Sequence, residues 1–574
     1  MNIMAVYHAN RLSSIAAEGG LISIRKGRHV LSCVDLISDG DLMAGAVGWL
    51  RNRAALSREL GFQMVARTSA LVVAAYRKWG MAYPAHLEGA VSTVLIDRSA
   101  DRMLVTRDRM GDRRIFYCRH GKTCAVSDHP DALIKSPYAS RIVDADGINE
   151  LFALGPARTP GRTPYRDVFA LEPGCALVAD RSGVSVRPYY ALEPRAHADD
   201  AAQTAQKVRD MLERAVDDIL PFSGAVMLSG GLDSTVLAAL MRERGDAPVA
   251  FSVDYEGDEE DFTGNVFQPE RDREFAAQAA ELYCAEHRLV TLGYDALYRA
   301  LGDAADARGF PGMADIDSSL FLFAREIAAG AGAIVSGECA DEVFLGYPWF
   351  APDRLTLDHG FPWSGSMDIR RAILRRGLAE ELCPEQYALT AFENAIDAVP
   401  VLPGEDADAA RMRAMQLICI QFFMRNLQER ALCMCEASSI AVYTPFSDDR
   451  LVEYVWNVPP EIKFMNGEVK GLLREAVKDL LPEPLLRRKK SPYPKTYSGL
   501  YTQQVRAGMD ELLADETSPI LRVLEPKVLR QLNDADLPAS GLPWFGQLMS
   551  GPQMLAYILQ VNDWMKKRRI EISL

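Results

Sequence analysis

The sequence predicts an α+β N-terminal part with antiparallel sheets, followed by an α/β part with a parallel sheet and a helical C-terminal portion. Between residues 20 and 188, short β-like segments alternate with turns; in "VSTVLIDRSADRMLVTRD", two apolar runs flank "DRSAD" as in a hairpin. After the polar stretch "ALEPRAHADD", strand-like and helix-like segments alternate, as in βαβ units. From residue 368 onward the pattern is mostly helical. We therefore expect two domains, 1–190 and 200–574.

Length and composition restrict the class of protein. At 574 residues the chain exceeds one ordinary core, and 48% hydrophobic with 25% charged residues is typical of globular proteins. A net charge of -14 disfavours nucleic acid as a partner over any broad surface. No apolar run approaches the roughly 20 residues of a membrane helix, and the start lacks the features of a signal peptide. We expect a cytoplasmic protein without a membrane partner.

Cysteine spacing gives no sign of a zinc or redox motif. The ten cysteines are scattered, and the closest pair, Cys433 and Cys435, is separated by one residue instead of the usual two. We expect reduced and mostly buried thiols.

The string "SGGLDS", Ser229 to Ser234, lies between a strand-like and a helix-like run. Glycines let backbone amides approach a ligand, and the N-terminus of the following helix favours an anion. The pattern predicts a phosphate loop, although it lacks the lysine of the G-x-x-x-x-G-K-[ST] loop. The alternative is a tight turn at Gly230 and Gly231 in which Ser229 or Asp233 caps the helix.

The whole string resembles the PP-loop of the N-type ATP pyrophosphatases, which activate a substrate as its adenylate. "SGECADEVFLGYPWF", residues 336–350, is similar to the S-G-E-G-x-D-E signature of asparagine synthetases. Both strings follow strand-like runs, and ligands of open α/β sheets bind at strand carboxyl ends. Segments such as "KGLLREAVKDLLPE" and "RRKKSPYPKT" extend the likeness over nearly the full length. The chain resembles the asparagine synthetase and β-lactam synthetase family, whose N-terminal domain is an Ntn-hydrolase-like class II glutamine amidotransferase.

The resemblance implies roles for several residues. Asp233 and Asp341 would hold Mg²⁺ against the phosphates of ATP, as hard oxygen ligands for a hard cation. Lys490 would neutralise charge on the phosphates and the acyl intermediate, with a solvated basic run as the alternative. Glu338 would act on the amine at the reacting centre, or only complement a helix dipole. The residues implied to bind ATP are Leu228, Ser229, Gly230, Gly231, Asp233, Ser234, Val253, Ser336 and Gly337.

The glutaminase signals of the family are missing. Glutamine-hydrolysing members begin with a cysteine whose own α-amino group activates the thiol. In this sequence Asn2 follows Met1, and the first cysteine is Cys33. Residues 45–47, "GAV", stand where the family shows N-G-E, and residues 68–71, "TSAL", where it shows S-D-T-E. We expect a degenerate amidotransferase domain that keeps its fold and lacks its reaction.

The acceptor region is also altered. Where asparagine synthetases carry D-R-M-S-M-A-x-G-x-E-x-R-x-P-F, this chain has "LCMCEASSIAVYTPF". Each lost charge-assisted hydrogen bond is worth about 1.5 to 3 kcal/mol, which predicts an acyl substrate other than aspartate. β-Lactam synthetases pair a pocket glutamate with a tyrosine, although they place a tyrosine where this chain has Glu338. Glu436 and Tyr443 are therefore candidate catalytic residues, with an ordinary surface carboxylate as the alternative for Glu436. The uncharged replacements of ionic residues are Leu432, Cys433, Ala441 and Tyr443.

The sequence thus predicts an ATP-dependent carbon-nitrogen ligase that adenylates a carboxylate for attack by an amine, without glutamine hydrolysis. The amine would belong to the same molecule, as in β-lactam synthetases, or to another. The closest alternative is an ammonia-dependent asparagine synthetase, and one from another class is a non-catalytic ATP-binding protein. ATP is the expected cosubstrate, Mg²⁺ the expected cofactor, and an amino-acid-like small molecule the expected substrate. The oligomeric state stays open, a homodimer included.

Overall fold

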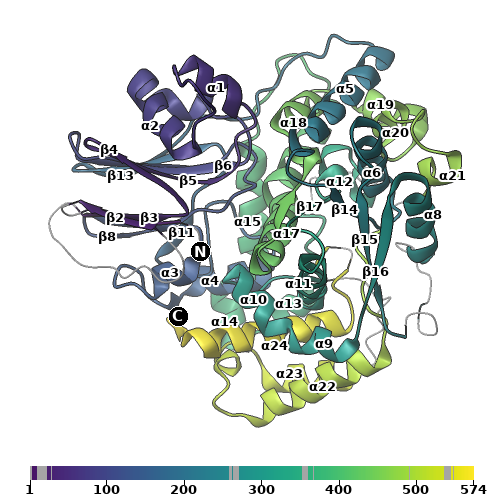
Figure 1. The fold of residues 1–574 in the computed structure, drawn as a ribbon. Coiled ribbons are helices and arrows are strands. Elements are labelled where there is room, and N and C mark those ends of the chain that lie inside the picture. Colours follow the sequence, from purple (N-terminus) through teal and green to yellow (C-terminus); the bar gives the residue numbers. More distant parts are fainter. Residues whose placement is uncertain are drawn as a thin grey trace. The chain divides into compact units, whose positions relative to one another are not determined.

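The computed structural model describes residues 3–8, 22–26, 29–257, 262, 270–351, 360–365, 367–489, 491–535, 544–546 and 548–574. These residues form two compact units, drawn in Figure 1. The first unit comprises Met1–Gly147, Thr159–Leu192 and Glu571–Leu574, and the second comprises Ile148–Arg158 and Glu193–Ile570. The segment 148–158 thus belongs to the second unit although the residues on both sides of it belong to the first. The last four residues belong to the first unit although they follow the second in sequence.

The first unit contains two six-stranded sheets, each antiparallel, as the sequence predicts. Their strand orders are β11-β8-β9-β1-β3-β2 and β13-β12-β7-β6-β5-β4. The hairpin expected at "DRSAD" is confirmed, because β6 and β7 pair from Thr93 with Thr106 to Asp97 with Arg102. The strands are β1 (Ile3–His8), β2 (Ile22–Lys26), β3 (His29–Cys33), β4 (Asp35–Asp39), β5 (Leu42–Gly48), β6 (Val91–Asp97), β7 (Arg102–Thr106), β8 (Phe116–His120), β9 (Thr123–Ser127), β11 (Val168–Ala170), β12 (Cys175–Asp180) and β13 (Gly183–Pro188).

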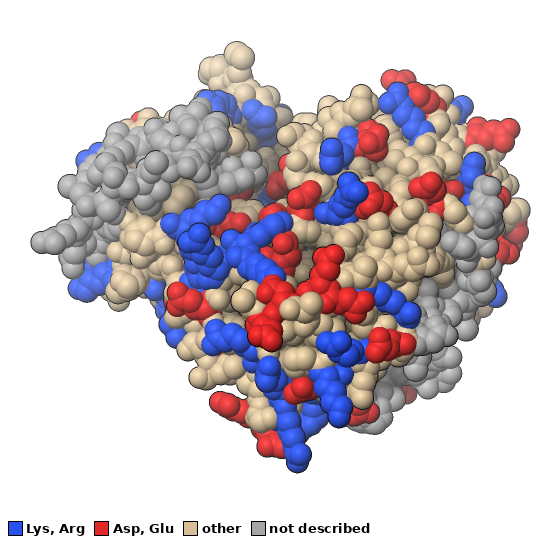
Figure 2. All heavy atoms as spheres, turned by 90° about the horizontal axis from the view of Figure 1, so that it is seen from below, with Lys and Arg blue, Asp and Glu red and all other residues tan. Residues whose placement is uncertain are grey.

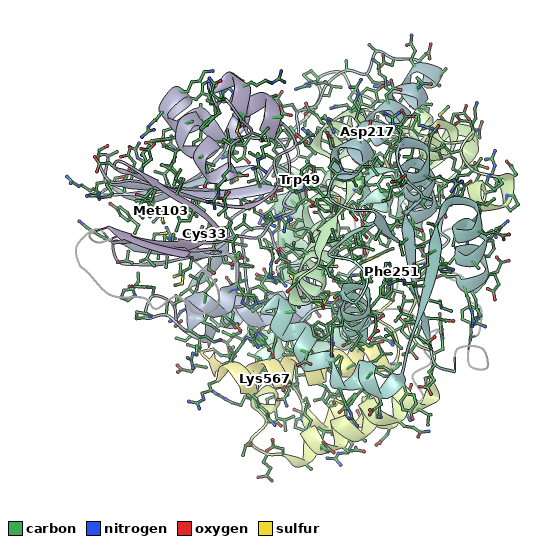
Figure 3. The ribbon with its side chains drawn as sticks, in the orientation of Figure 1. Cys33, Trp49, Met103, Asp217, Phe251 and Lys567 are labelled. Carbon is green, nitrogen blue, oxygen red and sulfur yellow. The ribbon has the colours of Figure 1, made fainter. Side chains whose placement is uncertain are left out.

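Two apolar cores hold the first unit together. One lies between the sheets and includes Cys33 and Met103, both labelled in Figure 3. The other lies between the second sheet and helix α2, where Leu71 and Val72 contact that core. The remaining elements here are α1 (Arg53–Glu59), α2 (Thr68–Trp79), η1 (Gly80–His86), α3 (Pro130–Ile134) and the short parallel pair β10 (Ile142–Val143) with β19 (Glu571–Ile572); α4 (Ala145–Asn149) and η2 (Glu150–Leu154) lie at the change of unit.

A five-stranded parallel sheet forms the centre of the second unit, which confirms the predicted α/β fold. Its order is β16-β15-β14-β17-β18. From β14 the chain adds β15 and then β16 on one side, and it returns to add β17 and then β18 on the other side of β14. The order in which strands are added therefore reverses beside β14. Ligands of open sheets bind at such a point, beyond the strand carboxyl ends. The strands are β14 (Ala225–Met227), β15 (Val249–Tyr255), β16 (Glu286–Leu292), β17 (Ala333–Val335) and β18 (Ala441–Tyr443).

Helices surround this sheet and form the C-terminal portion. Phe251 of β15, labelled in Figure 3, packs in a core with Leu320 and Phe323. The helices are α5 (Ala201–Ile219), α6 (Leu232–Arg244), α8 (Arg273–Tyr283), α9 (Tyr294–Arg299), α10 (Leu301–Arg308), α11 (Asp315–Ala328), α12 (Ala340–Val343), η3 (Pro348–Phe350), α13 (Met367–Ala372), α14 (Arg376–Leu382), α15 (Pro384–Asp397), α16 (Ala407–Ile418), η4 (Cys419–Met424), α17 (Arg425–Ala437), η5 (Pro445–Ser447), α18 (Asp449–Trp456), α19 (Pro460–Lys463), η6 (Met465–Gly467), α20 (Gly471–Ala476), α21 (Glu483–Leu486), α22 (Gly499–Ala514), η7 (Pro519–Arg522), α23 (Pro526–Asp534) and α24 (Pro552–Arg568).

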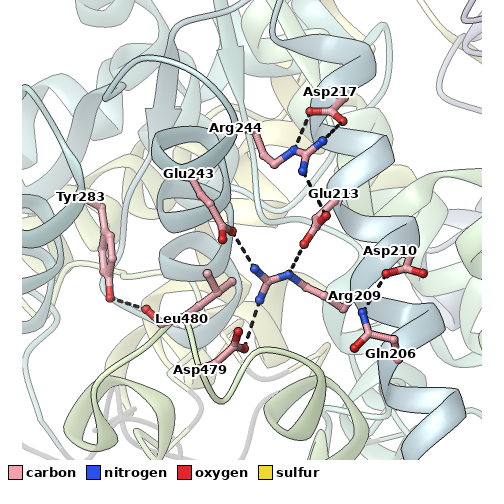
Figure 4. A network of polar contacts seen from close by, with 10 residues as sticks. All are labelled: Gln206, Arg209, Asp210, Glu213, Asp217, Glu243, Arg244, Tyr283, Asp479 and Leu480. Carbon is pink, nitrogen blue, oxygen red and sulfur yellow. Dashed lines mark hydrogen bonds and ion pairs between the residues drawn. The ribbon is translucent and has the colours of Figure 1, made fainter.

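Ion pairs fix the helix before the phosphate loop to the helix after it. Arg209 of α5 contacts Glu213 at 2.6 Å, Glu243 of α6 at 2.6 Å and Asp479 at 3.3 Å (Figure 4). On the face drawn in Figure 2, basic and acidic side chains are interspersed. Within the described ranges, no helix has the length and apolar character needed to cross a membrane.

Candidate active site

The predicted phosphate loop connects β14 to α6. Gly230 has a φ of +69°, and a Cβ at this position would lie 2.3 Å from the backbone nitrogen of Ala276 in α8. Only glycine therefore fits where the loop passes this helix. The Ser229 and Ser234 hydroxyls lie 3.1 Å apart and close the loop, while no side chain caps α6 at Gly231.

The second motif approaches this loop from β17. A Cβ on Gly337 would lie 3.1 Å from the backbone nitrogen of Ser234, so the two motifs lie in direct backbone contact. The next turn contains Cys339 in the left-handed conformation, with φ at +79°, where the family signature has glycine. This turn leads into α12, which carries Asp341.

Two predicted metal ligands converge on one lysine. The Nζ atom of Lys470 lies 2.6 Å from an oxygen of Asp233 and 2.6 Å from an oxygen of Asp341. Burial alone would lower the pKa of Lys470, but the two carboxylates raise it above its ordinary value. Lys470 directly precedes α20 and has the left-handed conformation, with φ at +57°. The contact also depends on Gly346, since a Cβ there would lie 1.9 Å from Asp341 Oδ1.

The carboxylates of Asp233 and Asp341 fit a shared divalent cation. Both carboxylates contact the same cation, the Lys470 ammonium, so they lie close enough to share one positive charge. Oxygen is also the donor that Mg²⁺ prefers. Within the described part of the chain, no group of three or more candidate metal ligands occurs. The protein would supply two of the ligands of such an ion, and phosphate oxygens and water are the partners that Mg²⁺ ordinarily keeps.

Glu338 follows Gly337 and forms an ion pair with Arg430 of α17. The Arg430 side chain is 2% exposed, and its guanidinium lies 4.8 Å from the centre of the Tyr493 ring. Tyr493 in turn lies within hydrogen-bonding distance of Ser319, at 3.1 Å. Glu338 thus has a fixed position at the reacting centre that the family resemblance implies.

One cavity of about 180 Å³ brings most of the predicted residues together. The predicted ATP contacts Gly230 and Gly231 are absent from its lining, so their role in binding ATP stays a prediction. The predicted residues that line the cavity are Leu228, Ser229, Asp233, Ser234, Val253, Ser336, Gly337, Glu338 and Asp341.

Two predicted catalytic residues do not line this cavity, and a third lies outside the described residues. Lys490 lies outside the described residues. Glu436 lies near the end of α17 and does not line the cavity. Tyr443 ends β18, and its ring stacks on Phe222 at 5.8 Å, also away from the cavity lining. Catalytic roles for these three residues stay predictions.

Sequence reasoning missed three residues that the structure places at the site: Lys470, Arg430 and Arg488. Arg488 belongs to the same basic run as Lys490, forms an ion pair with Asp272 and donates to the Ser229 carbonyl at 3.1 Å. Lys470 lies in a segment that resembles the family, but a single lysine before a short helix has no distinctive pattern. The one feature that could have identified Lys470 is that it opens "KGLLREAVKDLLPE", a segment that resembles the family, but the sequence alone assigned this lysine no function.

Among the described residues of the first unit, the predicted positions form no comparable arrangement of reactive groups. Cys33 is fully buried, its thiol donates to the Ala46 carbonyl at 3.3 Å, and burial raises its pKa to about 11. "TSAL" opens α2, where the Ser69 hydroxyl donates to Asp35 at 2.6 Å. "GAV" lies inside β5. These segments serve the fold of the unit.

Comparison with known proteins identifies both parts of the chain. Residues 207–566 match the asparagine synthase family, and residues 48–190 match a glutamine amidotransferase domain. "Asparagine synthetase [glutamine-hydrolyzing] 3" of Bacillus subtilis is 33% identical, with 96% of this chain and 91% of that protein covered. "Amidase chyE" of Penicillium rubens is 23% identical over 75% of this chain and 73% of its own length.

Two further likenesses are to a mycobacterial relative and to a solved structure. A "Putative asparagine synthetase [glutamine-hydrolyzing]" of Mycobacterium tuberculosis is 23% identical over 74% of this chain and 69% of its own. Among solved structures, the glutamine phosphoribosylpyrophosphate amidotransferase of Bacillus subtilis with ADP and GMP covers 46% of this chain and 68% of its own, with 12% identity and a TM-score of 0.22. From the match over 207–566 and the relative at 33% identity, the chain belongs to the asparagine synthase family and is an ATP-dependent carbon-nitrogen ligase.

Proposed function

We propose that this ligase adenylates a substrate carboxylate and passes the acyl group to an amine, without hydrolysing glutamine. The observation that carries the proposal is the cavity beside β14, which unites the Ser229–Ser234 loop, Asp233, Asp341 and the Glu338–Arg430 pair. A loop for phosphates, two carboxylates for a metal and a carboxylate at the opposite motif are the groups that this reaction requires.

In the first step, the loop and the N-terminus of α6 bind the phosphates of ATP. Asp233 and Asp341 would hold Mg²⁺, which offsets phosphate charge when bound. One oxygen of the substrate carboxylate attacks the α-phosphorus, the bond between the α- and β-phosphates breaks, and pyrophosphate leaves. Lys470 lies beside both aspartates and would pair with phosphate oxygens as negative charge develops on them.

In the second step, the amine nitrogen attacks the acyl carbon, the bond from that carbon to AMP breaks, and AMP leaves with the bonding electrons. A base must take one proton from the nitrogen. Glu338 is our candidate, because its ion pair with buried Arg430 fixes its position in the cavity. Glu436 and Tyr443 remain the candidates for an amine held within the same substrate molecule.

Two features of the first unit support the absence of glutamine hydrolysis. A thiolate is needed for that reaction, whereas burial raises the pKa of Cys33 to about 11 and that of Cys118 to about 12. The strings that stand in place of the family's glutamine-binding residues are engaged in β5 and α2. The amine would therefore arrive as free ammonia or on a substrate.

Product analysis tests the proposal. The full chain, incubated with ATP, Mg²⁺, candidate amino acids and amines, should form AMP and pyrophosphate, observed by ³¹P NMR. Glutamine should not replace the amine, and no glutamate should appear. ADP and phosphate as products would contradict the adenylation step, and stoichiometric glutamate would contradict the inert first unit.

A second candidate is an ammonia-dependent asparagine synthetase, favoured by the 33% identity to a protein named "Asparagine synthetase [glutamine-hydrolyzing] 3" together with the missing N-terminal cysteine signal in this chain. It predicts asparagine from aspartate, ATP and ammonium in the absence of glutamine. Formation of asparagine at a rate comparable to the best other acid would establish this candidate. Its absence at high ammonium would eliminate it.

A further inference from the structure

One helical face beside the Glu338–Arg430 pair is apolar. Phe423, Leu427, Arg430 and Ala431 all line the cavity. Leu427 precedes Arg430 by three residues and Ala431 by four, so on α17 these side chains share one face. The guanidinium at the reacting centre therefore has apolar neighbours along its own helix.

Two other segments extend this apolar lining. Met313, just before α11, is 1% exposed, and Leu548 is 7% exposed; both line the same cavity. Together with Phe423, Leu427 and Ala431 they form what we call the apolar face. It combines three chain segments far apart in sequence, so it is not a by-product of one amphipathic helix.

The charged residues that line the cavity do not favour a second carboxylate on the substrate. The cations among its described lining residues are Arg273 and Arg430. Arg430 is paired with Glu338, and Arg273 lies 3.6 Å from Asp254. Four further carboxylates line the cavity, at Asp233, Asp272, Asp341 and Glu342. None of the described lining residues is left to pair with an additional negative group, and burying a charge without a partner is strongly unfavourable.

From this lining we infer that the acid activated here has an apolar, uncharged body next to its carboxyl group, and that this body packs on the apolar face. The inference rests on the proposed adenylation and specifies its substrate class. It excludes aspartate as the preferred acid, because the second charge of aspartate would meet apolar side chains. Arg430 contributes no net charge to the binding of the acid, since Glu338 balances it.

Stable mimics of the acyl adenylate test the inference directly. Four acyl-sulfamoyl adenosines, with 4-methylpentanoyl, 3-phenylpropanoyl, β-aspartyl and 3-carboxypropanoyl groups, would be titrated into the full chain by calorimetry. We expect the two apolar mimics to bind at least tenfold more tightly than the two charged ones. Equal or tighter binding of the charged mimics would overturn the inference and leave adenylation intact. If none binds more tightly than AMP, the proposed function itself fails.

Two variants locate the preference at the apolar face. Leu427→Arg places a cation there and should shift the ratio of affinities at least tenfold toward the 3-carboxypropanoyl mimic. Leu389→Arg, on the exposed side of α15, is the control and should leave the ratio unchanged. Should Leu427→Arg not fold, Ala431→Leu fills the same face and should weaken the 3-phenylpropanoyl mimic at least tenfold with AMP binding retained. An unchanged ratio in the folded variant would place the acyl group elsewhere and overturn the inference.

Discussion

In the first unit, the Cys33 thiol lies in an apolar core between two sheets, where burial raises its pKa to about 11. In the second unit, Asp233 and Asp341 each have a carboxylate oxygen within 2.7 Å of Lys470 Nζ, beside a cavity. Both sets are largely withdrawn from water. The difference is that the charged groups of the second unit have partners of opposite sign and a space beside them for a ligand.

This contrast is the basis of our proposal that the two units differ in activity, since a fold by itself does not imply a reaction. Packing and hydrogen bonds suffice to hold a fold, and the buried Cys33 thiol contributes to both in the first unit. A reaction needs charges that are held apart from water and still reach a ligand. The second unit shows that arrangement around a cavity.

The largest expected effect comes from removing the lysine between the two aspartates. Lys470→Met should lower the rate of AMP formation about 1,000-fold, because charge that develops on the phosphates loses its fixed partner. Lys478→Met is the matched control, since Lys478 is exposed and contacts only Glu475 among the ion pairs described. A rate within tenfold of the wild type would show that Lys470 is not part of the reaction. Thermal unfolding checks that the variant is folded.

A smaller effect, on stability as well as rate, is expected at the reacting centre. Glu338→Ala leaves the Arg430 guanidinium buried without its carboxylate and should lower the free energy of unfolding by about 3 kcal/mol. Denaturant unfolding measures this change. Asp408→Ala removes an exposed partner of Arg411 and should change stability by less than about 1 kcal/mol. Equal effects of the two substitutions would contradict the burial argument.

Lys463 predicts a pH dependence of stability. It lies buried with Gln416 Oε1 at 2.6 Å, and burial, with Arg413 nearby, lowers its pKa to about 7. An unfolded lysine has a pKa of about 10.4, so between these values the unfolded chain binds the extra proton. Stability from this group therefore rises with pH from about 7 to 10.4 and is lost as pH falls toward 7.

Lys463→Met should remove that contribution, so that the difference in unfolding free energy between wild type and variant changes by about 1.4 kcal/mol per pH unit from pH 7.5 to 9. Chemical denaturation at three pH values is the measurement. Parallel pH profiles of the two proteins would show that Lys463 does not titrate in this window.

At Cys33 we expect that a substitution has no effect on the synthetase rate. Cys33→Ser should leave the rate with ammonium or an amine substrate unchanged, and neither protein should release glutamate from glutamine. The physical reason is that the thiol is fully buried and its pKa is raised. Glutamate release by the wild type that disappears in Cys33→Ser would break the contrast between the two units.

Much of the fold followed from local patterns. The hairpin at "DRSAD" and the strands ending at the two Ser-Gly motifs depend on alternation, on apolar runs and on glycine, which act over a few residues. The passage 148–158 shows the limit. It belongs to the second unit, where Tyr387 donates to Glu150 at 2.7 Å and Asn149 donates to the Leu382 carbonyl at 3.0 Å. Those partners lie more than 200 positions away and leave no local signal.

The site shows the same division. Asp233 and Asp341 were identified because each stands in a motif of its own, whereas Lys470 lies 237 positions from Asp233 and has no motif. Arg430 lies 92 positions from Glu338, just before the rewritten acceptor stretch. Pairings of this length depend on how the sheet and α17 pack. A single sequence does not encode that packing in any local pattern.

An isotope experiment tests the central claim most directly. The substrate acid is labelled with ¹⁸O in its carboxyl group and incubated with the full chain, ATP, Mg²⁺ and the amine, and the phosphorus products are analysed by mass spectrometry. Adenylation predicts that one ¹⁸O atom appears in AMP and none in pyrophosphate. Transfer of ¹⁸O to inorganic phosphate, with ADP as the other product, would contradict the account.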